Sequence, residues 1–218
     1  SDVMLISKEK IEIASTICKV DLVSDLVGEF PELQGILGGY FAQAQGFDKE
    51  ISVAISEHYL PIGMDSITPK KDYSVALSLS DKIDSLVGFF GLKLKPSSSK
   101  DPYALRRMAI SLVRLIVENN RDFKIRDLIN YSCMFYKEQN FKFDSKLLQK
   151  DLNEFILERL KNYLKEKKIR NDIIESSMNV TNIDELLKVF KKSSVLNKNI
   201  KKDFCKDVIS VYKRSANI

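Results

Sequence analysis

The stretch Asp101-Pro102-Tyr103-Ala104-Leu105-Arg106-Arg107 carries the clearest helix-start signal in the 218-residue chain. An aspartate can accept hydrogen bonds from the free backbone N–H groups of a first helical turn, and proline at the first position needs no donor. Apolar side chains then recur on one helical face, at positions 105, 109, 112 and 116. The sequence therefore predicts an amphipathic helix that begins here.

Similar helical signals recur along the chain, whereas the alternation typical of strands is weak. Earlier helices are predicted at 8–27, 31–45, 49–59 and 73–90, and later ones near 125–138, 145–168, 170–177, 183–192 and 199–213. The expected N-caps are Asp72, Asp144-Ser145 and Asn182. The predicted fold class is all-α.

Composition divides the chain into two regions. All eight glycines and all five prolines lie between Gly28 and Pro102. Residues 1–102 have a net charge of −5 and contain no arginine, whereas residues 103–218 have a net charge of +10. We therefore expect a turn-rich, acidic front region, followed by a basic helical region in which no Pro- or Gly-rich linker occurs.

Several function classes are excluded by residue counts. The three cysteines, Cys18, Cys133 and Cys205, have no zinc-like spacing, so we expect reduced thiols and a cytoplasmic protein. The only histidine is His58, which removes most metal-hydrolase and His-dependent triad chemistry. The longest uncharged stretch, 33–47, is too short to span a membrane.

The front region contains a series of distinctive blocks: Cys18–Val23 (CKVDLV), Glu29–Gly35 (EFPELQG), Gly39–Ala42 (GYFA), Glu57–Pro61 (EHYLP), Ser80–Phe90 (SDKIDSLVGFF) and Asp101–Arg107 (DPYALRR). In their residues and their order, these blocks resemble the beta subunit of bacterial heterotetrameric glycyl-tRNA synthetase. The rear region matches more loosely, and its last residues resemble the start of the family's anticodon-binding domain. The resemblance implies an internal fragment with an HD-like helical domain at 1–120 and a basic helical region at 121–218.

The resemblance also implies where a metal site would lie. HD phosphohydrolases hold a divalent metal with a histidine, an adjacent His-Asp pair and a distant aspartate, and Asp81 resembles that last ligand. The region Cys18–Asp21 offers no His-Asp pair, and its lysine would repel a metal. We expect a degenerate site without metal, in which Asp81 and Asp84 cap helices or pair with Lys82 and nearby arginines.

Two other features invite a functional reading but favour a structural one. His58 is predicted at a helix C-terminus, where it can bond to the last carbonyls; RNA contact is the alternative. The acids of Glu29–Gly35 lie in a sharp turn, and Gly35 and Gly39, four residues apart, let another helix approach closely. We expect packing there rather than acid–base catalysis.

The candidate nucleic-acid-binding residues are Lys100, Arg106, Arg107 and Arg114. On a helical wheel Arg107 and Arg114 point away from the apolar stripe, with Arg106 at the flank and Lys100 just upstream. Arginine suits contact with RNA phosphates. Pairing with acids of the front region, or simple solvation, remains open.

The functional prediction is a non-catalytic segment of glycine–tRNA ligase that engages tRNA and serves as a scaffold. The resemblance implies tRNA(Gly), the alpha subunit and a second beta subunit as partners, without a membrane. It implies no cofactor in this segment, because the alpha subunit binds ATP, magnesium and glycine. The alternatives are an HD-type metal-dependent phosphohydrolase and a protein–protein adaptor.

Overall fold

The computed structural model describes residue 4 and the ranges 6–181 and 184–216. Within these residues every regular element is a helix and no strand occurs, so the all-α prediction is confirmed. The α-helices are α1 (Lys8–Ile17), α2 (Asp25–Glu29), α3 (Ile36–Ala44), α4 (Lys49–Glu57), α5 (Asp72–Gly91), α6 (Leu105–Glu118), α7 (Ile125–Glu138), α8 (Ser145–Glu166), α9 (Asn171–Val180), α10 (Leu186–Asn199) and α11 (Asp203–Ala216). The 3₁₀ helices are η1 (Val20–Val23) and η2 (Pro31–Leu33).

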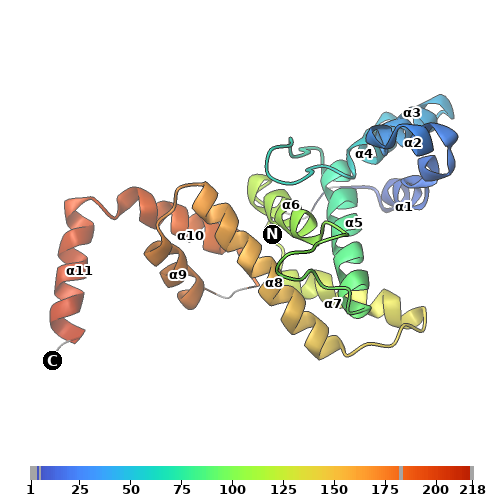
Figure 1. Cartoon of the computed structure of the whole chain (residues 1–218). Coiled ribbons are helices and arrows are strands. Elements are labelled where there is room, and N and C mark those ends of the chain that lie inside the picture. Colours follow the sequence, from blue (N-terminus) through green and yellow to red (C-terminus); the bar gives the residue numbers. More distant parts are fainter. Residues whose placement is uncertain (1–3, 5, 182–183, 217–218) are drawn as a thin grey trace.

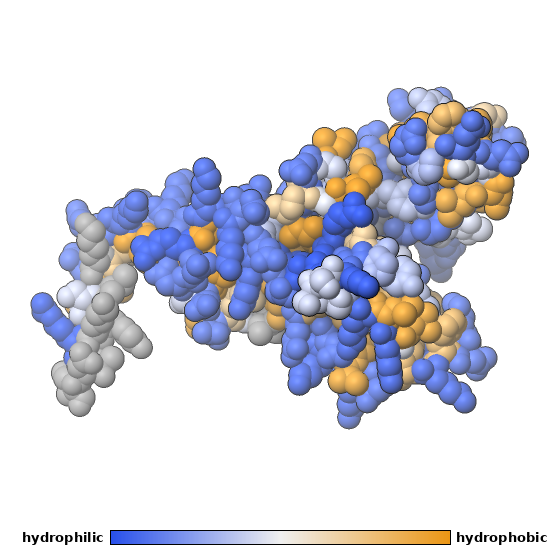
Figure 2. Space-filling model, in the orientation of Figure 1, coloured by the Kyte–Doolittle hydropathy of each residue, from blue (hydrophilic) through white to orange (hydrophobic). Residues whose placement is uncertain are grey.

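The helices form an elongated molecule (Figure 1). Helices α1 to α4 gather at one end, and α5 leads from them into the middle. There α6 packs against α5, α8 and α10, while α7 packs against α5 and α8. Helix α11 lies beyond α10 at the far end. Hydrophilic residues cover most of the visible surface of α8 to α10 (Figure 2).

Two apolar cores hold these helices together. The smaller core gathers side chains from α1, α3, α4 and the first half of α5, including Ala14, Ile55 and Leu77. The larger core runs through α5 to α10 and includes Leu86 and Leu112. Helix α5 contributes to both cores, so one continuous helix joins them. The domain boundary at residue 120 stays a prediction, but α6 belongs wholly to the larger core.

The predicted helix at 8–27 is wrong in its length. The chain forms α1, then η1, then α2, because the Ser24 hydroxyl accepts from the backbone N–H of Val27 and caps a new helix. The predicted helix at 31–45 also divides, into η2 and α3. Gly35 between them has φ 80°, a left-handed conformation that favours glycine.

The turn before α6 differs from the predicted helix start. The Asp101 carboxylate accepts from the backbone N–H groups of Leu105 and Arg106, both at 2.9 Å, but α6 begins only at Leu105. Ala104 has φ 56°, so the chain makes a left-handed turn before the helix. Asp101 therefore caps α6 across this turn rather than from the position directly before the first helical residue.

The other predicted N-caps lie on α5, α8 and the approach to α10. Asp144 caps α8 as predicted. Asp72 is the first residue of α5 rather than its N-cap, which is Lys71. Asn182 lies outside the described residues.

The three cysteines are free thiols, as the sequence predicts.

Candidate functional site

Asp81, the residue that resembles an HD metal ligand, is bonded to a lysine ammonium. Lys19 Nζ lies 2.5 Å from Asp81 Oδ1, and the Asp81 side chain is only 9% exposed. Burial lowers the pKa of Lys19, but the nearby Asp81 carboxylate more than offsets this, and the pKa is raised above its ordinary value. The Lys19 ammonium also lies 5.0 Å from the Tyr59 ring centroid, a cation–π distance. The Asp81 carboxylate is therefore paired with a cation from the turn between α1 and η1.

The expected partners of Asp81 and Asp84 were wrong. Lys19, rather than Lys82 or an arginine, makes the ion pair with Asp81. The Asp84 carboxylate accepts a hydrogen bond from the Tyr136 hydroxyl at 3.3 Å. Burial raises the pKa of Asp84, and the Tyr136 bond opposes that rise. Both partners are distant in sequence, so helix-local spacing could not identify them.

Lys82 is buried, 4% exposed, and its ammonium joins two helices. Its Nζ donates to the carbonyl oxygens of His58, Tyr59 and Leu60 at 3.2–3.3 Å, and to Ser78 Oγ at 2.9 Å. These carbonyls follow the end of α4, where free C=O groups and the helix dipole favour a cation. Burial lowers the pKa of Lys82 to about 8, although Asp81 acts to raise it.

His58 ends α4 and is fully buried, as a structural role requires. Its Nδ1 lies 2.6 Å from the Ile55 carbonyl oxygen, so Nδ1–H is the donor. Nε2 is buried and has no hydrogen-bond partner among the described residues. Burial lowers the pKa of His58, and the bond to Ile55 opposes this. The predicted contact with the last carbonyls of the helix is confirmed.

Asp21 organises the segment that faces His58 and Tyr59. Its Oδ2 accepts from the backbone N–H groups of Gly35 at 2.6 Å and Gly38 at 3.3 Å, so a fully buried carboxylate lies at the start of α3. A Cβ on Gly39 would lie 2.6 Å from the Ser52 carbonyl oxygen and still closer to the Ser56 side chain, so α4 approaches α3 closely at this glycine. The packing role predicted for these glycines is confirmed.

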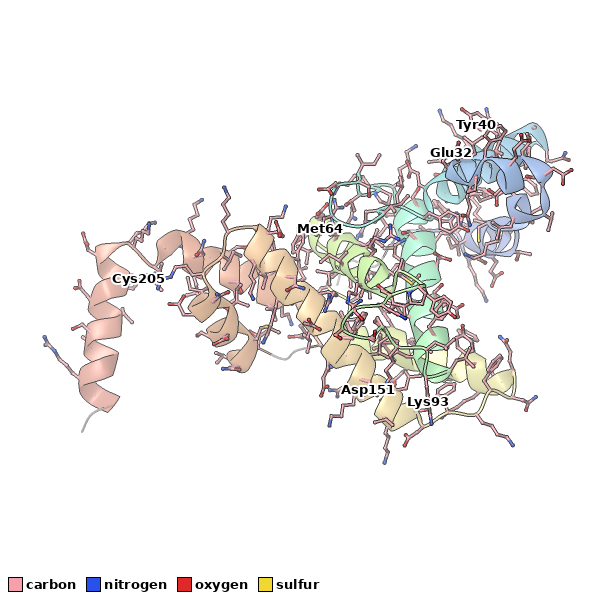
Figure 3. All side chains as sticks on the ribbon, in the orientation of Figure 1. Glu32, Tyr40, Met64, Lys93, Asp151 and Cys205 are labelled. Atoms are coloured by element: carbon pink, nitrogen blue, oxygen red, sulfur yellow. The ribbon has the colours of Figure 1, made fainter. Side chains whose placement is uncertain are left out.

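A groove of about 470 Å³ lies beside the side chains of Asp81 and Lys82. It is lined by Lys19, from the turn between α1 and η1, and by Asp81 and Lys82, from α5. On the other side it is lined by Tyr103 and Arg107, at the start of α6. Its other borders are the segment that carries Glu32 and the loop that follows Pro61. Figure 3 labels Glu32 and Met64, and Met64 belongs to the loop that follows Pro61. The groove therefore lies where the front helices, α5 and α6 meet.

Three of the four candidate RNA-binding residues lie near the start of α6. Arg107 is exposed and lines the groove, and its aliphatic chain passes Gly63. Lys100 is exposed in the preceding loop. Arg106 is half-buried, donates to the Ser97 carbonyl and lies 3.9 Å from the carboxylate of residue 101. Of these three, Arg107 and Lys100 keep their charged groups at the surface.

The expectation that Arg114 points outward is wrong. Arg114 is 7% exposed; its Nε donates to Glu118 at 2.8 Å and its Nη1 to the Gly63 carbonyl at 2.6 Å. The loop that carries Gly63 covers the face of α6 that a helical wheel assigns to solvent. Thr68 in the same loop also bonds to Glu118, at 2.6 Å. Arg114 therefore attaches this loop to α6.

Sequence reasoning missed the roles of Lys82, Asp21 and Tyr103 in the site. Nothing in the local spacing marks Lys82 or Asp21 as buried, because the backbone groups to which they bond lie 14 or more residues away in the chain. Tyr103 lies within the block that starts α6, yet only the tertiary structure brings its ring to the groove. Its aromatic character beside two arginines was the one signal that could have identified it.

The part of the chain that the structure describes contains neither a cluster of metal-binding side chains nor a membrane-spanning helix. No group of three or more His, Cys, Asp or Glu side chains there could hold a metal ion. Likewise, none of the helices described is long and apolar enough to cross a membrane.

Several known proteins that are similar to this chain share one description. A family profile described as glycyl-tRNA synthetase beta subunit matches residues 2–179. The chain is 40% identical over 209 residues to the glycine–tRNA ligase beta subunit of Rickettsia canadensis, covering 94% of this chain and 30% of the relative. It is 38% identical over 210 residues to that of Rhodospirillum centenum, covering 96% and 29%.

The beta subunit of a third bacterium gives a similar match. The chain is 36% identical over 214 residues to the glycine–tRNA ligase beta subunit of Lactiplantibacillus plantarum, covering 97% of this chain. In each case the chain spans about 30% of the relative's length. The matches nevertheless extend over nearly all of this chain, front and rear regions alike. The chain belongs to the glycyl-tRNA synthetase beta-subunit family.

Proposed function

We propose that this chain is a non-catalytic segment of a glycine–tRNA ligase that engages tRNA(Gly) and serves as a scaffold. In this proposal the alpha subunit binds ATP, magnesium and glycine, and the segment works in the cytoplasm beside the alpha subunit and a second beta subunit. The observation that supports the tRNA role best is the exposed Arg107 guanidinium at the edge of the groove. No ion pair joins it to another described residue.

The scaffold role is supported by the network beneath the groove. Lys19 bonds to a carboxylate of α5, and Lys82 of α5 bonds to carbonyls at the end of α4, so the two charges hold the turn after α1, the end of α4 and α5 together. These ammonium groups occupy the surroundings of Asp81, where a metal would need further hard donor ligands. The donor set therefore does not fit the HD-type metal-dependent phosphohydrolase alternative.

The tRNA contact is proposed for Arg107 and Lys100, with Arg106 beside them. Arginine and lysine in an exposed turn at the start of a helix can reach RNA phosphates without leaving a buried partner unpaired. Arg114 is left out of this set, because its guanidinium already binds Glu118 and the Gly63 carbonyl.

The test uses the assembled synthetase with Lys100 and Arg107 both replaced by alanine. We expect weaker tRNA(Gly) binding and a log–log salt dependence that is flatter by about 0.7–0.9 for each phosphate that the variant no longer binds. Formation of glycyl-adenylate should remain unchanged. Lys8→Ala, which removes an exposed charge on α1, is the matched control.

A salt dependence identical to that of the unmodified enzyme, in a protein that still melts normally, would contradict the tRNA contact. The protein–protein adaptor would then be the better description of this segment.

A further inference from the structure

We propose that the groove between the front helices and α6 receives one unpaired nucleotide of RNA, with its base stacked on Tyr103 and its phosphate at Arg107. This inference rests on the proposed tRNA role and specifies where a single nucleotide would bind. Single-stranded RNA is recognised chiefly by stacking of splayed bases on aromatic rings, together with cationic contacts to the backbone.

An aromatic surface forms one wall of the groove. The Tyr103 ring stacks on Phe89, with 4.4 Å between centroids and 28° between planes. Tyr103 nevertheless remains 44% exposed and lines the groove. A ring supported on one side and open elsewhere needs little ordering before a base can stack on it. The pair therefore forms a prepared stacking surface.

The backbone around Tyr103 is also held in place. The Asp101 carboxylate accepts from the N–H groups of Leu105 and Arg106, and the Asp101 carbonyl accepts from the Ala104 N–H at 3.1 Å. These bonds close the turn that contains Tyr103. The position of the Tyr103 backbone relative to α6 is therefore set by hydrogen bonds before any ligand binds.

The charges of the groove leave one cation available for a phosphate. Three cations and two carboxylates line it, namely Lys19, Lys82, Arg107, Glu32 and Asp81. Lys19 is paired with Asp81, and Lys82 is bonded to buried carbonyls. Arg107 is thus the cation whose guanidinium no described acid neutralises, and it lies close in sequence to Tyr103. A ring and an unneutralised guanidinium on one wall match the base and the phosphate of one nucleotide.

The size and polarity of the groove also fit a nucleotide. A volume of about 470 Å³ falls within the range of small-ligand sites, roughly 300–1,000 Å³. Gln34 Nε2 and the Tyr59 hydroxyl, 2.6 Å apart, line the groove opposite α6 and can hydrogen-bond to base edges. Glu32 on that side repels phosphate, which favours an orientation with the phosphate at Arg107 and the base inward. A paired base inside a duplex could not enter a groove of this size.

The experiment measures binding of the chain to a fluorescein-labelled short single-stranded RNA and to a blunt-ended RNA duplex. Tyr103→Leu should weaken single-strand binding by about 5- to 150-fold, the loss that follows from removing one stacked base. It should leave duplex binding unchanged. Tyr103→Phe keeps the ring and should bind the single strand normally. Tyr131→Leu, which removes an exposed tyrosine outside the groove, should change neither.

The charge of the groove is tested with Arg107→Gln. We expect this variant to flatten the salt dependence of single-strand binding by about 0.7, the value for one phosphate contact. Competition with the mononucleotide AMP identifies the source of the ligand. Displacement of the RNA by AMP alone would support the site and assign it to a free nucleotide; displacement only by oligonucleotides would support it and assign it to an RNA strand.

Unchanged single-strand binding in a folded Tyr103→Leu variant would overturn the nucleotide site. Equal losses for Tyr103→Leu and Tyr103→Phe would also overturn it, because the ring would then not be the binding element. If Arg107→Gln still flattens the salt dependence in either case, the proposed tRNA contact stands without the nucleotide site. If no RNA binds and the salt dependence of the assembled synthetase is unaffected, both proposals fail.

Discussion

At the residue scale, the site is shaped by charges that reach distant backbone groups. Lys82 carries an ammonium into the interior and bonds to three carbonyls at and beyond the end of α4. Removing this ammonium would take a donor from the His58 and Tyr59 carbonyls, whereas the Leu60 carbonyl would still accept from the Ser78 hydroxyl. An unsatisfied buried group costs about 1–3 kcal/mol. Lys82 is therefore part of the framework under the groove.

His58 gives a residue-scale prediction for pH dependence. Its pKa is lowered chiefly by burial, with Lys19 and Lys82 adding to the effect and the Ile55 carbonyl and Asp81 opposing it. The unfolded chain binds a proton near pH 6.5, whereas the folded chain binds it only at a lower pH. The free energy of unfolding should therefore fall as the pH is lowered through about 6.5.

The check is an NMR titration of the imidazole, which is free of overlap because His58 is the only histidine. Unfolding free energies at neutral and mildly acidic pH should show a smaller decrease in His58→Gln than in the unmodified chain. An imidazole that titrates at or above its ordinary pKa would contradict the buried, neutral state.

At the element scale, the two arginines of α6 that share a helical-wheel direction have different surroundings. The loop after Pro61 covers Arg114 but leaves Arg107 at the surface. Helix α6 is buried along 109–117, so its apolar stripe understates how much of the helix is enclosed. A wheel describes one helix, whereas the loop that covers it comes from elsewhere in the chain.

Arg114→Ala should lower the free energy of unfolding by about 2–4 kcal/mol, because the Gly63 carbonyl would lose its buried donor and Glu118 would keep hydrogen bonds from Thr68 and Tyr163 but lose its ion pair. Arg107→Ala on the same helix is the matched control and should change it by less than about 0.5 kcal/mol. Urea unfolding of both variants measures the difference. Equal effects would show that the two arginines have equivalent surroundings, contrary to this structure.

At the scale of the whole molecule, α5 joins the two apolar cores. Leu77 packs in the smaller core, whereas Val75 and Leu79 pack in the larger one, so one helix must be intact for both. The ion pair between Lys19 and Asp81 also links the turn after α1 to α5. Neither core can lose α5 without exposing apolar surface.

We therefore expect the two cores to unfold cooperatively, in one thermal transition. Far-ultraviolet circular dichroism and calorimetry of the 218-residue chain should give coincident midpoints. Asp81→Asn, which removes the charge from the link to Lys19, should lower the midpoint while keeping a single transition. Two well-separated transitions in the unmodified chain would mean that the cores are independent.

Much of the candidate site can be located from the sequence, but little of its bonding can. The blocks around Asp81 and Asp101–Arg107 point to the positions that border the groove. Helical spacing predicts the exposure of Arg107 correctly, whereas it fails for Arg114, seven residues later. Such spacing indicates which residues share a face; it does not indicate whether another segment covers that face.

The amino-acid sequence alone is enough to predict the all-helical class, the division between an acidic front and a basic rear, and the cap at Asp144. These depend on local hydrogen bonding, turn residues and the periodicity of apolar side chains, all of which involve residues close to one another in the chain. The partners of Asp81 and Lys82, the burial of Arg114 and the groove at Tyr103 emerge only from tertiary packing. The groups that meet there come from separate segments of the chain, so only the packing of α1, α4, α5 and α6 brings their atoms within bonding distance.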